Sequence, residues 1–336
     1  MPRSAPGFWQ GRGAAAWCLF PLSLLFAFLA GLRRRLFALG LLKVERLPVP
    51  VIVVGNIAVG GSGKTPIALW LADALRGRGH RPGIVSRGFG GSVEGTAEVP
   101  IGGDPARYGD EPVLMAALSG CPVWVGRDRP SAGRSLLAAH PEVDVLIADD
   151  GLQHYRLARD VEIIVVDEAT LGNRFRLPAG PLREGLGRLA EATVVLAQGG
   201  LSPALRAAIG AAPVFGFELA GAAFERVGAR GERCLADDFR GRRVHAMAGI
   251  GRPERFFRQL EAMGLAIERR PFADHHAFTP SDLAVPDGDV LLMTEKDAVK
   301  CAPFAPADSW VWPVRAQLAP EAAKLIVEKL DGPPTA

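Results

Sequence analysis

The amino-acid sequence predicts an α/β fold built on a parallel β-sheet, with a smaller α/β domain towards the C-terminus and an apolar helix at the N-terminus. Two apolar runs rich in β-branched residues, at 51–54 and 143–149, have the length and composition of buried parallel strands. From residue 243 onwards, short apolar runs alternate with amphipathic stretches, which indicates a second α/β unit. Hydrophobic residues make up 49% and charged residues 22% of the chain, which excludes a disordered protein.

The first segment, 1–47, is expected to form a helix associated with a membrane. Residues 13–32 contain no charged side chain and are numerous enough for a helix to cross a bilayer. Arginines at 33–35, with Lys43 and Arg46 beyond them, can contact anionic headgroups. Because these cations lie on the C-terminal side, where the rest of the chain must stay in the cytosol, we favour a helix lying in the interface over a spanning one.

This segment is also compatible with a signal peptide, a spanning helix or a core helix. A secretory signal peptide has a similar basic start and apolar centre, but no clear Ala-x-Ala cleavage site directly precedes the arginines. A spanning helix is interrupted by Pro21, Ser23 and Gly31. A core helix of the first domain is less consistent with the adjacent arginines at 33–35.

The net charge of +3 is unevenly distributed along the chain. Residues 1–50 hold seven of the 39 basic residues and one of the 36 acidic residues, which leaves 32 basic and 35 acidic residues elsewhere. The body of the protein is therefore mildly acidic, and the sequence argues against a nucleic-acid partner.

A phosphate-binding loop is predicted between the strand at 51–54 and an apolar-periodic helix that begins near Pro66. Its glycines let backbone N–H groups curve around phosphates, Lys64 can reach the β and γ oxygens, and the Thr65 hydroxyl can bind Mg²⁺. Ala58 stands where the usual pattern has glycine, but the flanking strand and helix favour a P-loop NTPase core over a chance glycine-rich turn. The nucleotide-binding candidates are Gly60, Gly61, Ser62, Gly63, Lys64, Thr65 and Pro66.

The predicted phosphate loop needs an acidic partner, which is expected at the end of the strand 143–149, where Asp149 and Asp150 follow each other. In an open α/β sheet, the carboxyl ends of the strands face the ligand crevice. Either carboxylate could therefore complete, with Thr65, the ligand set of a Mg²⁺ ion bound to a nucleotide.

The segments divide into a P-loop core at 48–212, a hairpin-like linker at 213–241 and a smaller α/β domain at 242–330 that closes the cleft. The smaller domain contains Gly249-Ile-Gly251 before a helix, but Glu254 stands at the third glycine position of a dinucleotide fingerprint. Residues 294–300 follow a predicted strand and are expected to face the cleft.

Seven short motifs occur in an order that is typical of one enzyme family, although each is weak by itself. They are Gly-Asn-Ile-x-Val-Gly-Gly-x-Gly-Lys-Thr-Pro (55–66), Ser86-Arg87-Gly88, Gly109-Asp110-Glu111-Pro112, Asp149-Asp150-Gly151-x-Gln153-His154, Pro178-x-Gly-Pro-Leu-Arg183-Glu184, Ala248-Gly249-Ile250 and Asp274-His275-His276. With these motifs the chain resembles the tetraacyldisaccharide 4′-kinases, the lipid A kinases of Gram-negative bacteria, over most of its length.

The resemblance implies that the chain uses ATP and Mg²⁺ to phosphorylate the 4′-hydroxyl of tetraacyldisaccharide 1-phosphate, which gives lipid IVA. It also implies attachment of the segment 1–47 to the cytosolic face of the inner membrane. Two alternatives are a P-loop kinase of another sugar or nucleoside and a membrane-associated regulatory NTPase. The oligomeric state is left open.

The resemblance also implies a catalytic pair, in which Asp110 matches the aspartate regarded as the base and His275 matches its partner. A carboxylate near the γ-phosphate can take the hydroxyl proton, and an imidazole bonded to it can fix its orientation. From the sequence alone, Asp110 could instead be the N-cap of a helix that begins near Pro112. Adjacent histidines diverge in a helix or strand, so His275 and His276 are a poor metal pair, and His276 is interpreted as a surface or capping residue.

Further residues of the motifs are candidates for contacts to substrate or for support of the site. Arg127 and Arg129 follow a predicted strand, where the sequence is equally consistent with phosphate contact and with a solvated surface. The remaining candidates are Glu111, Gln153, His154, Arg183 and Glu184.

Overall fold

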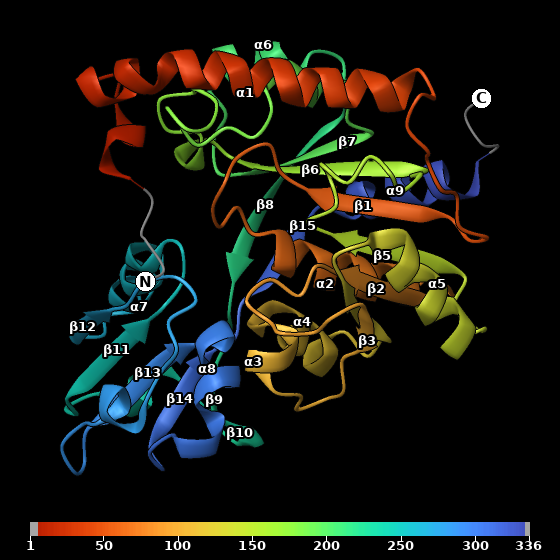
Figure 1. Cartoon of the computed structure of the whole chain (residues 1–336). Helices are drawn as coiled ribbons and strands as arrows, with labels where there is room; N and C mark the ends of the chain where they lie inside the picture. Colours follow the sequence, from red (N-terminus) through yellow and green to blue (C-terminus); the bar gives the residue numbers. More distant parts are fainter. Residues whose placement is uncertain (1–5, 333–336) are drawn as a thin grey trace.

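The computed structural model describes residues 6–332, which form two β-sheets and a long separate helix (Figure 1). The larger sheet has nine strands in the order β15-β8-β7-β6-β1-β5-β2-β4-β3. Its inner strands run parallel to one another, whereas the edge strands β3 and β15 run antiparallel to their neighbours. The strands are β1 (Val51–Gly55), β2 (Pro82–Ser86), β3 (Thr96–Glu98), β4 (Val123–Gly126), β5 (Val145–Asp149), β6 (Val161–Asp167), β7 (Val194–Gln198), β8 (Val214–Ala220) and β15 (Arg315–Leu318).

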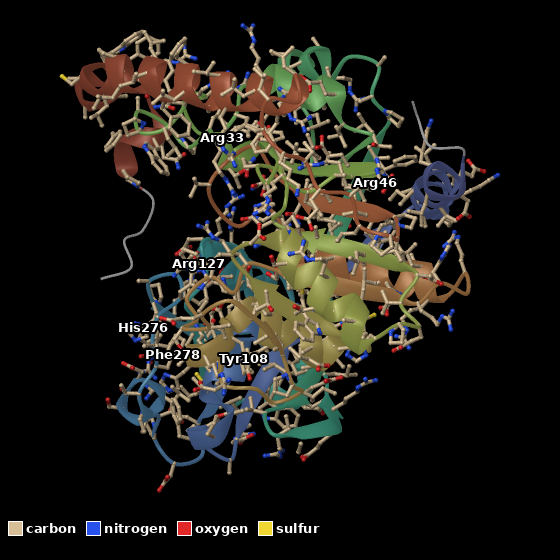
Figure 2. The ribbon with its side chains drawn as sticks, turned by 45° about the vertical axis from the view of Figure 1, so that its right-hand side comes forward. Arg33, Arg46, Tyr108, Arg127, His276 and Phe278 are labelled. Carbon is tan, nitrogen blue, oxygen red and sulfur yellow. The ribbon has the colours of Figure 1, made fainter. Side chains whose placement is uncertain are left out.

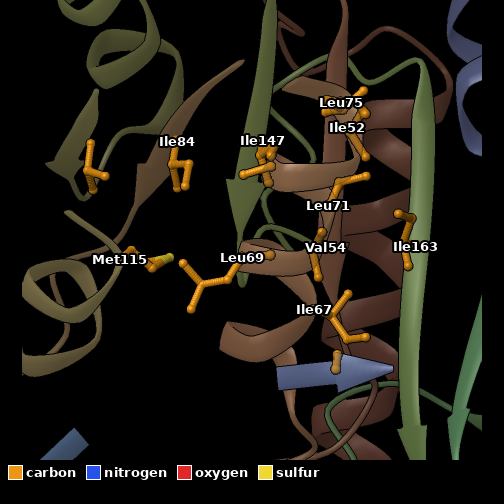
Figure 3. Close-up of a cluster of buried hydrophobic side chains, with 14 of the residues drawn as sticks. Ile52, Val54, Ile67, Leu69, Leu71, Leu75, Ile84, Met115, Ile147 and Ile163 are labelled. Carbon is orange, nitrogen blue, oxygen red and sulfur yellow. The ribbon is translucent and has the colours of Figure 1, made fainter. Parts of the chain in front are cut away.

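Helices cover both faces of the larger sheet, because alternate residues of its strands point to opposite sides. Ile52 and Val54 of β1 join a core cluster with α2, α4 and α9, part of which Figure 3 shows. Val51 and Val53 belong to a second cluster on the other face, with Leu136 of α5. The helices of this unit are α2 (Lys64–Arg76), α3 (Pro105–Tyr108), α4 (Asp110–Leu118), α5 (Arg129–Ala139), α6 (Pro203–Ile209) and α9 (Pro320–Asp331).

The smaller sheet has six strands in the order β10-β9-β14-β13-β11-β12. Its four strands β14, β13, β11 and β12 are parallel, and β9 and β10 form an antiparallel hairpin beside them. Aromatic side chains such as Phe224, Phe257 and Trp310 fill its core. The elements are β9 (Phe224–Arg226), β10 (Ala229–Cys234), β11 (Val244–Ala248), α7 (Pro253–Ala262), β12 (Ile267–Pro271), β13 (Val290–Thr294), α8 (Glu295–Cys301) and β14 (Ser309–Trp312).

Short 3-10 helices connect these elements. They are η1 (Gly7–Gln10), η2 (Glu168–Thr170), η3 (Leu186–Glu191), η4 (Ala236–Phe239), η5 (Pro280–Leu283) and η6 (Ala302–Phe304).

The two sheets revise the predicted domain boundaries. The linker predicted at 213–241 is divided, since β8 joins the larger sheet whereas β9 and β10 belong to the smaller one. The smaller unit predicted at 242–330 ends with β14, because the chain then returns: β15 pairs with β8, and Ile326 of α9 enters the larger core. These two boundaries were predicted wrongly because a short edge strand is specified by a partner that is distant in the sequence.

Helix α1 (Ala14–Ala38) lies along one side of the molecule, over the layer that contains β6 and β7 (Figure 1). Among residues 6–332 it is the one helix long and apolar enough to cross a membrane. Only Ala16 and Ser23 are buried, whereas Trp17 is 53% and Phe28 is 65% exposed. This exposure contradicts the alternative of a core helix, because a core helix buries its apolar side chains.

The helix is attached to the rest of the protein along one side. Ser23 Oγ donates a hydrogen bond of 2.8 Å to the Arg176 carbonyl and accepts one of 3.0 Å from the Ala179 amide. Phe175 packs its ring against Trp17 at 5.2 Å, and Arg33, on the side that faces the core (Figure 2), donates to a backbone carbonyl there.

The helix also continues through Pro21, Ser23 and Gly31, which the sequence predicted to interrupt it. The first five residues of the predicted segment 1–47, including Arg3, lie outside the described residues.

The packing of the larger core can be tested at Ile147, which is fully buried in the inner strand β5. Ile147→Ala should lower the free energy of unfolding by about 2–5 kcal/mol, because the side chain leaves a cavity that the sheet cannot close. Urea unfolding of the purified protein measures this change. Ile101→Ala, at a position that is 78% exposed, should change the free energy by less than about 0.5 kcal/mol. Equal losses in both variants would contradict the placement of the core.

Candidate active site

The candidate site lies where the two sheets face each other at the carboxyl ends of their parallel strands. Residues after β1, β4 and β5, together with the start of α4, form one side of the cleft, and residues after β11, β12 and β13 form the other. The approach is close, since a Cβ atom placed on Gly251 would lie 3.4 Å from the amide nitrogen of Gly61. This edge is where open α/β sheets bind their ligands.

The glycine-rich residues form a tight turn between β1 and α2. Gly60 and Gly63 have φ angles of 121° and 86°, a region that glycine adopts without steric strain. Inside the turn, Asn56 Nδ2 donates a hydrogen bond of 2.9 Å to Ser62 Oγ. Helix α2 begins at Lys64, so its free N–H groups and its positive dipole end point into the turn, which suits a phosphate.

Ala58, which departs from the usual loop pattern, lies where glycine is not needed. Its side chain is buried, and its backbone forms a bridge with Leu182. Its carbonyl oxygen accepts a hydrogen bond of 3.2 Å from the Arg183 guanidinium. A Cβ atom is therefore accommodated here, and Arg183 joins the loop to the segment that follows β6.

Asp149 ends strand β5 with its carboxylate fully buried. One oxygen, Oδ2, accepts a hydrogen bond of 3.1 Å from Ser86 Oγ, while Oδ1 is buried without a hydrogen-bond partner. Burial, together with the negative charges of Glu111 and Asp150, raises the pKa of Asp149 to about 7. Such a carboxylate gains stability from a cation at its free oxygen.

Asp150 is in the opposite situation, because its charge is already compensated. It lies 3.7 Å from Lys64 Nζ and 3.2 Å from Arg183 Nη2. Burial would raise the pKa of Asp150, but Lys64 and Arg183 outweigh it and lower the pKa to about 2. Asp150 therefore fixes the phosphate-loop lysine rather than offering a free oxygen.

The residues of this corner fit a Mg²⁺ ion that arrives with a nucleotide. No group of three or more His, Cys, Asp or Glu side chains suited to a metal occurs within residues 6–332. An ion bound to phosphates needs fewer protein ligands, since phosphate and water oxygens complete its octahedron. The free Oδ1 of Asp149 is a suitable ligand, and Thr65, in the first turn of α2, carries a hydroxyl next to the phosphate loop.

Asp110 and His275 are in direct contact across the cleft. Asp110 is the first residue of α4 and is 5% exposed, and His275 Nδ1 lies 2.9 Å from its Oδ2. The N-cap of α4 is Gly109, with φ 91°, so the structure contradicts the interpretation of Asp110 as the N-cap. His275 has a φ of 58°, a costly conformation for a residue with a Cβ, which is typical of functional positions.

The charges around this pair keep Asp110 ionised. Burial would raise the pKa of Asp110, but the hydrogen bond from His275 and the positive charges of Lys296 and Lys300 lower it. The hydrogen bond to Asp110 raises the pKa of His275, while burial and Lys296 oppose this increase. Lys296 Nζ also lies 3.1 Å from Glu111 Oε1, so Glu111 belongs to the same charge cluster.

Gln153 and Glu184 lie in a hydrogen-bonded network between the phosphate loop and the segment after β6. Gln153 Nε2 donates to Glu184 Oε1 at 2.8 Å, and its Oε1 accepts from Arg183 at 3.0 Å. Glu184 also accepts from Tyr155 at 2.5 Å and lies 3.4 Å from Arg188. These bonds occupy Glu184, and Gln153 connects it to Arg183.

The remaining candidates occupy different surroundings. Arg129 is buried and donates to the Asp149 carbonyl at 3.1 Å, which contradicts a solvated surface position. Arg127, which is labelled in Figure 2, lines a cavity of about 340 Å³ together with Arg87. Burial, together with Arg129, lowers the pKa of His154 to about 4, so this ring is neutral.

His276 points away from the Asp110–His275 pair. Its ring lies 4.8 Å from that of Phe278, beside which Figure 2 shows it, and its Nε2 is 3.3 Å from Asp282. The two histidines therefore contact different carboxylates, His275 that of Asp110 and His276 that of Asp282.

Sequence reasoning did not single out Lys296, Asn56 or Ser86 individually. Lys296 was expected only as part of a segment facing the cleft. One signal was available for it: Lys296 and Lys300 lie four residues apart after a strand end, which places both on one side of a helix.

Comparisons with known proteins agree on one family. The sequence model of the family described as tetraacyldisaccharide-1-P 4′-kinase matches residues 15–331. The tetraacyldisaccharide 4′-kinase of Aromatoleum aromaticum is 59% identical over 337 residues, which cover 100% of both chains. That of Azoarcus sp. (strain BH72) is 58% identical over 333 residues, 98% of this chain and 96% of the relative.

A solved structure extends the agreement to the fold. LpxK from Aquifex aeolicus, in complex with ATP, is 30% identical and superposes with a TM-score of 0.79, covering 94% of this chain and 99% of that chain. The matched family model and these relatives span nearly the whole sequence, and the chain belongs to the tetraacyldisaccharide-1-P 4′-kinase family.

Proposed function

We propose that this chain transfers the γ-phosphate of ATP to the 4′-hydroxyl of tetraacyldisaccharide 1-phosphate, which gives lipid IVA and ADP. The observation that carries the proposal is the contact of the buried Asp110 with the half-buried His275, at a cleft beside the phosphate loop. A regulatory NTPase needs the loop but has no use for a base at a second substrate. Membership of the family and full-length relatives named for this reaction support the choice of substrate.

In this proposal the loop binds the triphosphate of ATP. Amides of Gly61 and Gly63 and the first turn of α2 contact phosphate oxygens, and Lys64 neutralises the charge that develops on transfer. A bound Mg²⁺ would compensate the negative charge of the β- and γ-phosphates, with Thr65 and Asp149 as its protein ligands. Asp149 is preferred over Asp150 because only Asp149 has a buried oxygen without a partner.

Asp110 acts as the base for the acceptor. As the 4′-oxygen bonds to the γ-phosphorus and the bond to the ADP oxygen breaks, Asp110 takes the hydroxyl proton. His275 fixes the direction of the carboxylate through its hydrogen bond of 2.9 Å. Because the pair spans the two sheets, correct alignment depends on how the smaller sheet meets the larger one.

The acceptor is a lipid, and we propose that α1 associates with the membrane as an interfacial helix at the cytosolic face of the inner membrane. Contacts to the protein occur at Trp17, Ser23 and Arg33, which are spread along the helix. A helix bound to a globular domain over this length cannot be surrounded by lipid, which argues against a spanning position. Exposed apolar side chains cover the opposite side, and the arginines at 33–35 lie next to them.

One assay separates this function from its alternatives. The full-length protein in detergent is incubated with ATP labelled at the γ-phosphate and tetraacyldisaccharide 1-phosphate. Labelled lipid is the expected product. Phosphorylation of a soluble sugar or nucleoside with no lipid product would favour another kinase, and ATP hydrolysis that ignores the lipid would favour a regulatory NTPase.

Lys64→Ala tests the phosphate loop. The variant should lose at least about 100-fold in kcat, because a charge that compensates the transferring phosphoryl group is removed. The fold should persist, as circular dichroism would show. Lys324→Ala, on the exposed surface of α9, provides the matched control and should retain full activity. Near-wild-type turnover of the Lys64 variant would refute the assignment of the loop.

Asp110→Asn tests the base. We expect kcat to fall by about 10²- to 10⁴-fold with little change in ATP affinity, because proton removal is lost while the nucleotide contacts remain. Asp104→Asn is a matched control, since Asp104 caps α3 through the Ala106 amide at 2.8 Å and has no part in the proposed proton transfer. A loss of melting temperature in the Asp110 variant without a loss of kcat would show that Asp110 has a structural role instead.

The membrane proposal is tested without shortening the helix, because its inner side holds contacts to the protein. Replacing Leu22, Leu25, Phe28 and Leu29, each at least 53% exposed, with glutamine should release the protein from vesicles that contain anionic lipid in a flotation experiment. Ile101→Gln with Leu235→Gln, at exposed positions outside α1, is the control and should still float. Unchanged flotation of the α1 variant would exclude this side of the helix as the attachment surface.

A further inference from the structure

Lys296 is a half-buried cation beside the proposed base that the reaction described above does not use. It lies at the start of α8, directly after β13, and its side chain is 16% exposed. Its Nζ is 3.1 Å from Glu111 Oε1, 3.3 Å from Asp274 Oδ1 and 3.5 Å from His275 Nε2. An ammonium group has three N–H donors, so these three neighbours account for all of them.

The contact with His275 restricts where the imidazole carries its proton. An ammonium group donates hydrogen bonds and accepts none, so Nε2 of His275 must offer a lone pair to Lys296. The proton of the neutral ring then resides on Nδ1, which faces Asp110 at 2.9 Å. The three groups form one directed chain, in which Lys296 donates to His275 and His275 donates to Asp110.

We propose that Lys296 is a positioning residue that holds His275 as the neutral Nδ1–H tautomer, so that Asp110 remains a free base. The proposal deepens the proposed function and rests on it for the role of Asp110. If His275 took a second proton at Nε2, the resulting imidazolium would bind Asp110 as an ion pair and weaken its basicity. The nearby positive charge of Lys296 disfavours that protonation.

The other charged groups around His275 make its protonation state depend more strongly on Lys296. Asp110 and Glu111 approach from α4, Asp274 from the loop of His275 itself, and Lys300 from α8, where its Nζ is 4.0 Å from Asp110 Oδ2. Phe89 covers the ring at a centroid distance of 5.0 Å. Without Lys296, the ring would face three carboxylates and one more distant cation, an environment that favours the imidazolium.

Lys296 is not needed to place the ring in the cleft. The backbone N–H of His275 donates to the Gly249 carbonyl at 3.2 Å and to Asp274 Oδ1 at 3.1 Å. The ring itself is bonded to Asp110 through Nδ1. Loss of Lys296 should therefore change the protonation of His275 more than its position.

NMR measures this protonation directly in the full-length protein in detergent. Histidines labelled with ¹³C and ¹⁵N are titrated by NMR, with the His275 signal assigned by its loss in His275→Asn. We expect ¹⁵N shifts typical of the Nδ1–H tautomer on the basic side of the His275 titration, where the ring is neutral. In Lys296→Met the pKa of His275 should rise by about one pH unit, and Lys296→Arg, which keeps the charge, should restore the wild-type value.

A kinetic measurement provides the second test. If protonated His275 is inactive, the acidic limb of the kcat/KM profile for lipid phosphorylation should move to higher pH by the same amount in Lys296→Met. Lys324→Met is the matched control on α9 and should leave the profile unchanged. A uniform drop in kcat with the same profile, or lower thermal stability alone, would mean a structural role and overturn the proposal.

The two measurements separate the failure of each claim. An Nε2–H tautomer in the wild-type protein, or an unchanged His275 pKa in Lys296→Met, overturns the role of Lys296 whatever the substrate is. The expected NMR result without any lipid product would overturn the proposed function alone. If Lys296→Met does not fold, Lys296→Gln, which keeps an N–H donor without the charge, takes its place and should show the same increase in pKa.

Discussion

The contact between Asp110 and His275, at 2.9 Å and 165 residues apart in sequence, constrains much of the structure. It requires the carboxyl ends of the two sheets to face each other, in agreement with the close approach of Gly251 to Gly61. The chain passes between the sheets twice, after β8 and again before β15. Two connections restrict the rotation of the smaller sheet relative to the larger one more than a single linker would. Both connections reach the larger sheet at the same end, because the end of β8 pairs with the start of β15.

The charge arrangement of the cleft follows from the same constraint. Buried carboxylates are costly unless cations pair with them. On the side of the phosphate loop, Lys64 and Arg183 compensate Asp150, and on the side of the smaller sheet Lys296 compensates Glu111. Asp149 is left without such a partner, and its pKa is raised to about 7, by burial first and then by nearby carboxylates. An arriving cation therefore finds one preferred oxygen rather than a general acidic surface.

Features that depend on neighbours in the sequence could be predicted, and those that depend on distant partners could not. The phosphate loop is a local turn set by Gly60, Gly63 and the start of α2, so its sequence pattern is sufficient. The pairing of β15 with β8, and the contact of Lys296 with Glu111 over 185 residues, have no local signature. The Asp110–His275 pair is predicted only through resemblance to a family, since the sequence around Asp110 by itself favours a helix cap.

Helix α1 also makes contacts with distant residues that its own sequence does not predict. These contacts connect the proposed membrane-attachment surface with the candidate active site. Its composition predicts an apolar outer side, but the sequence also predicts that Ser23 interrupts the helix. Ser23 instead bonds to the backbone at Arg176 and Ala179, a few residues before Arg183, which reaches Ala58 in the phosphate loop. Each of these contacts is a hydrogen bond to backbone. The position of the phosphate loop relative to the exposed side of α1 is therefore fixed by packed structure rather than by a flexible tether.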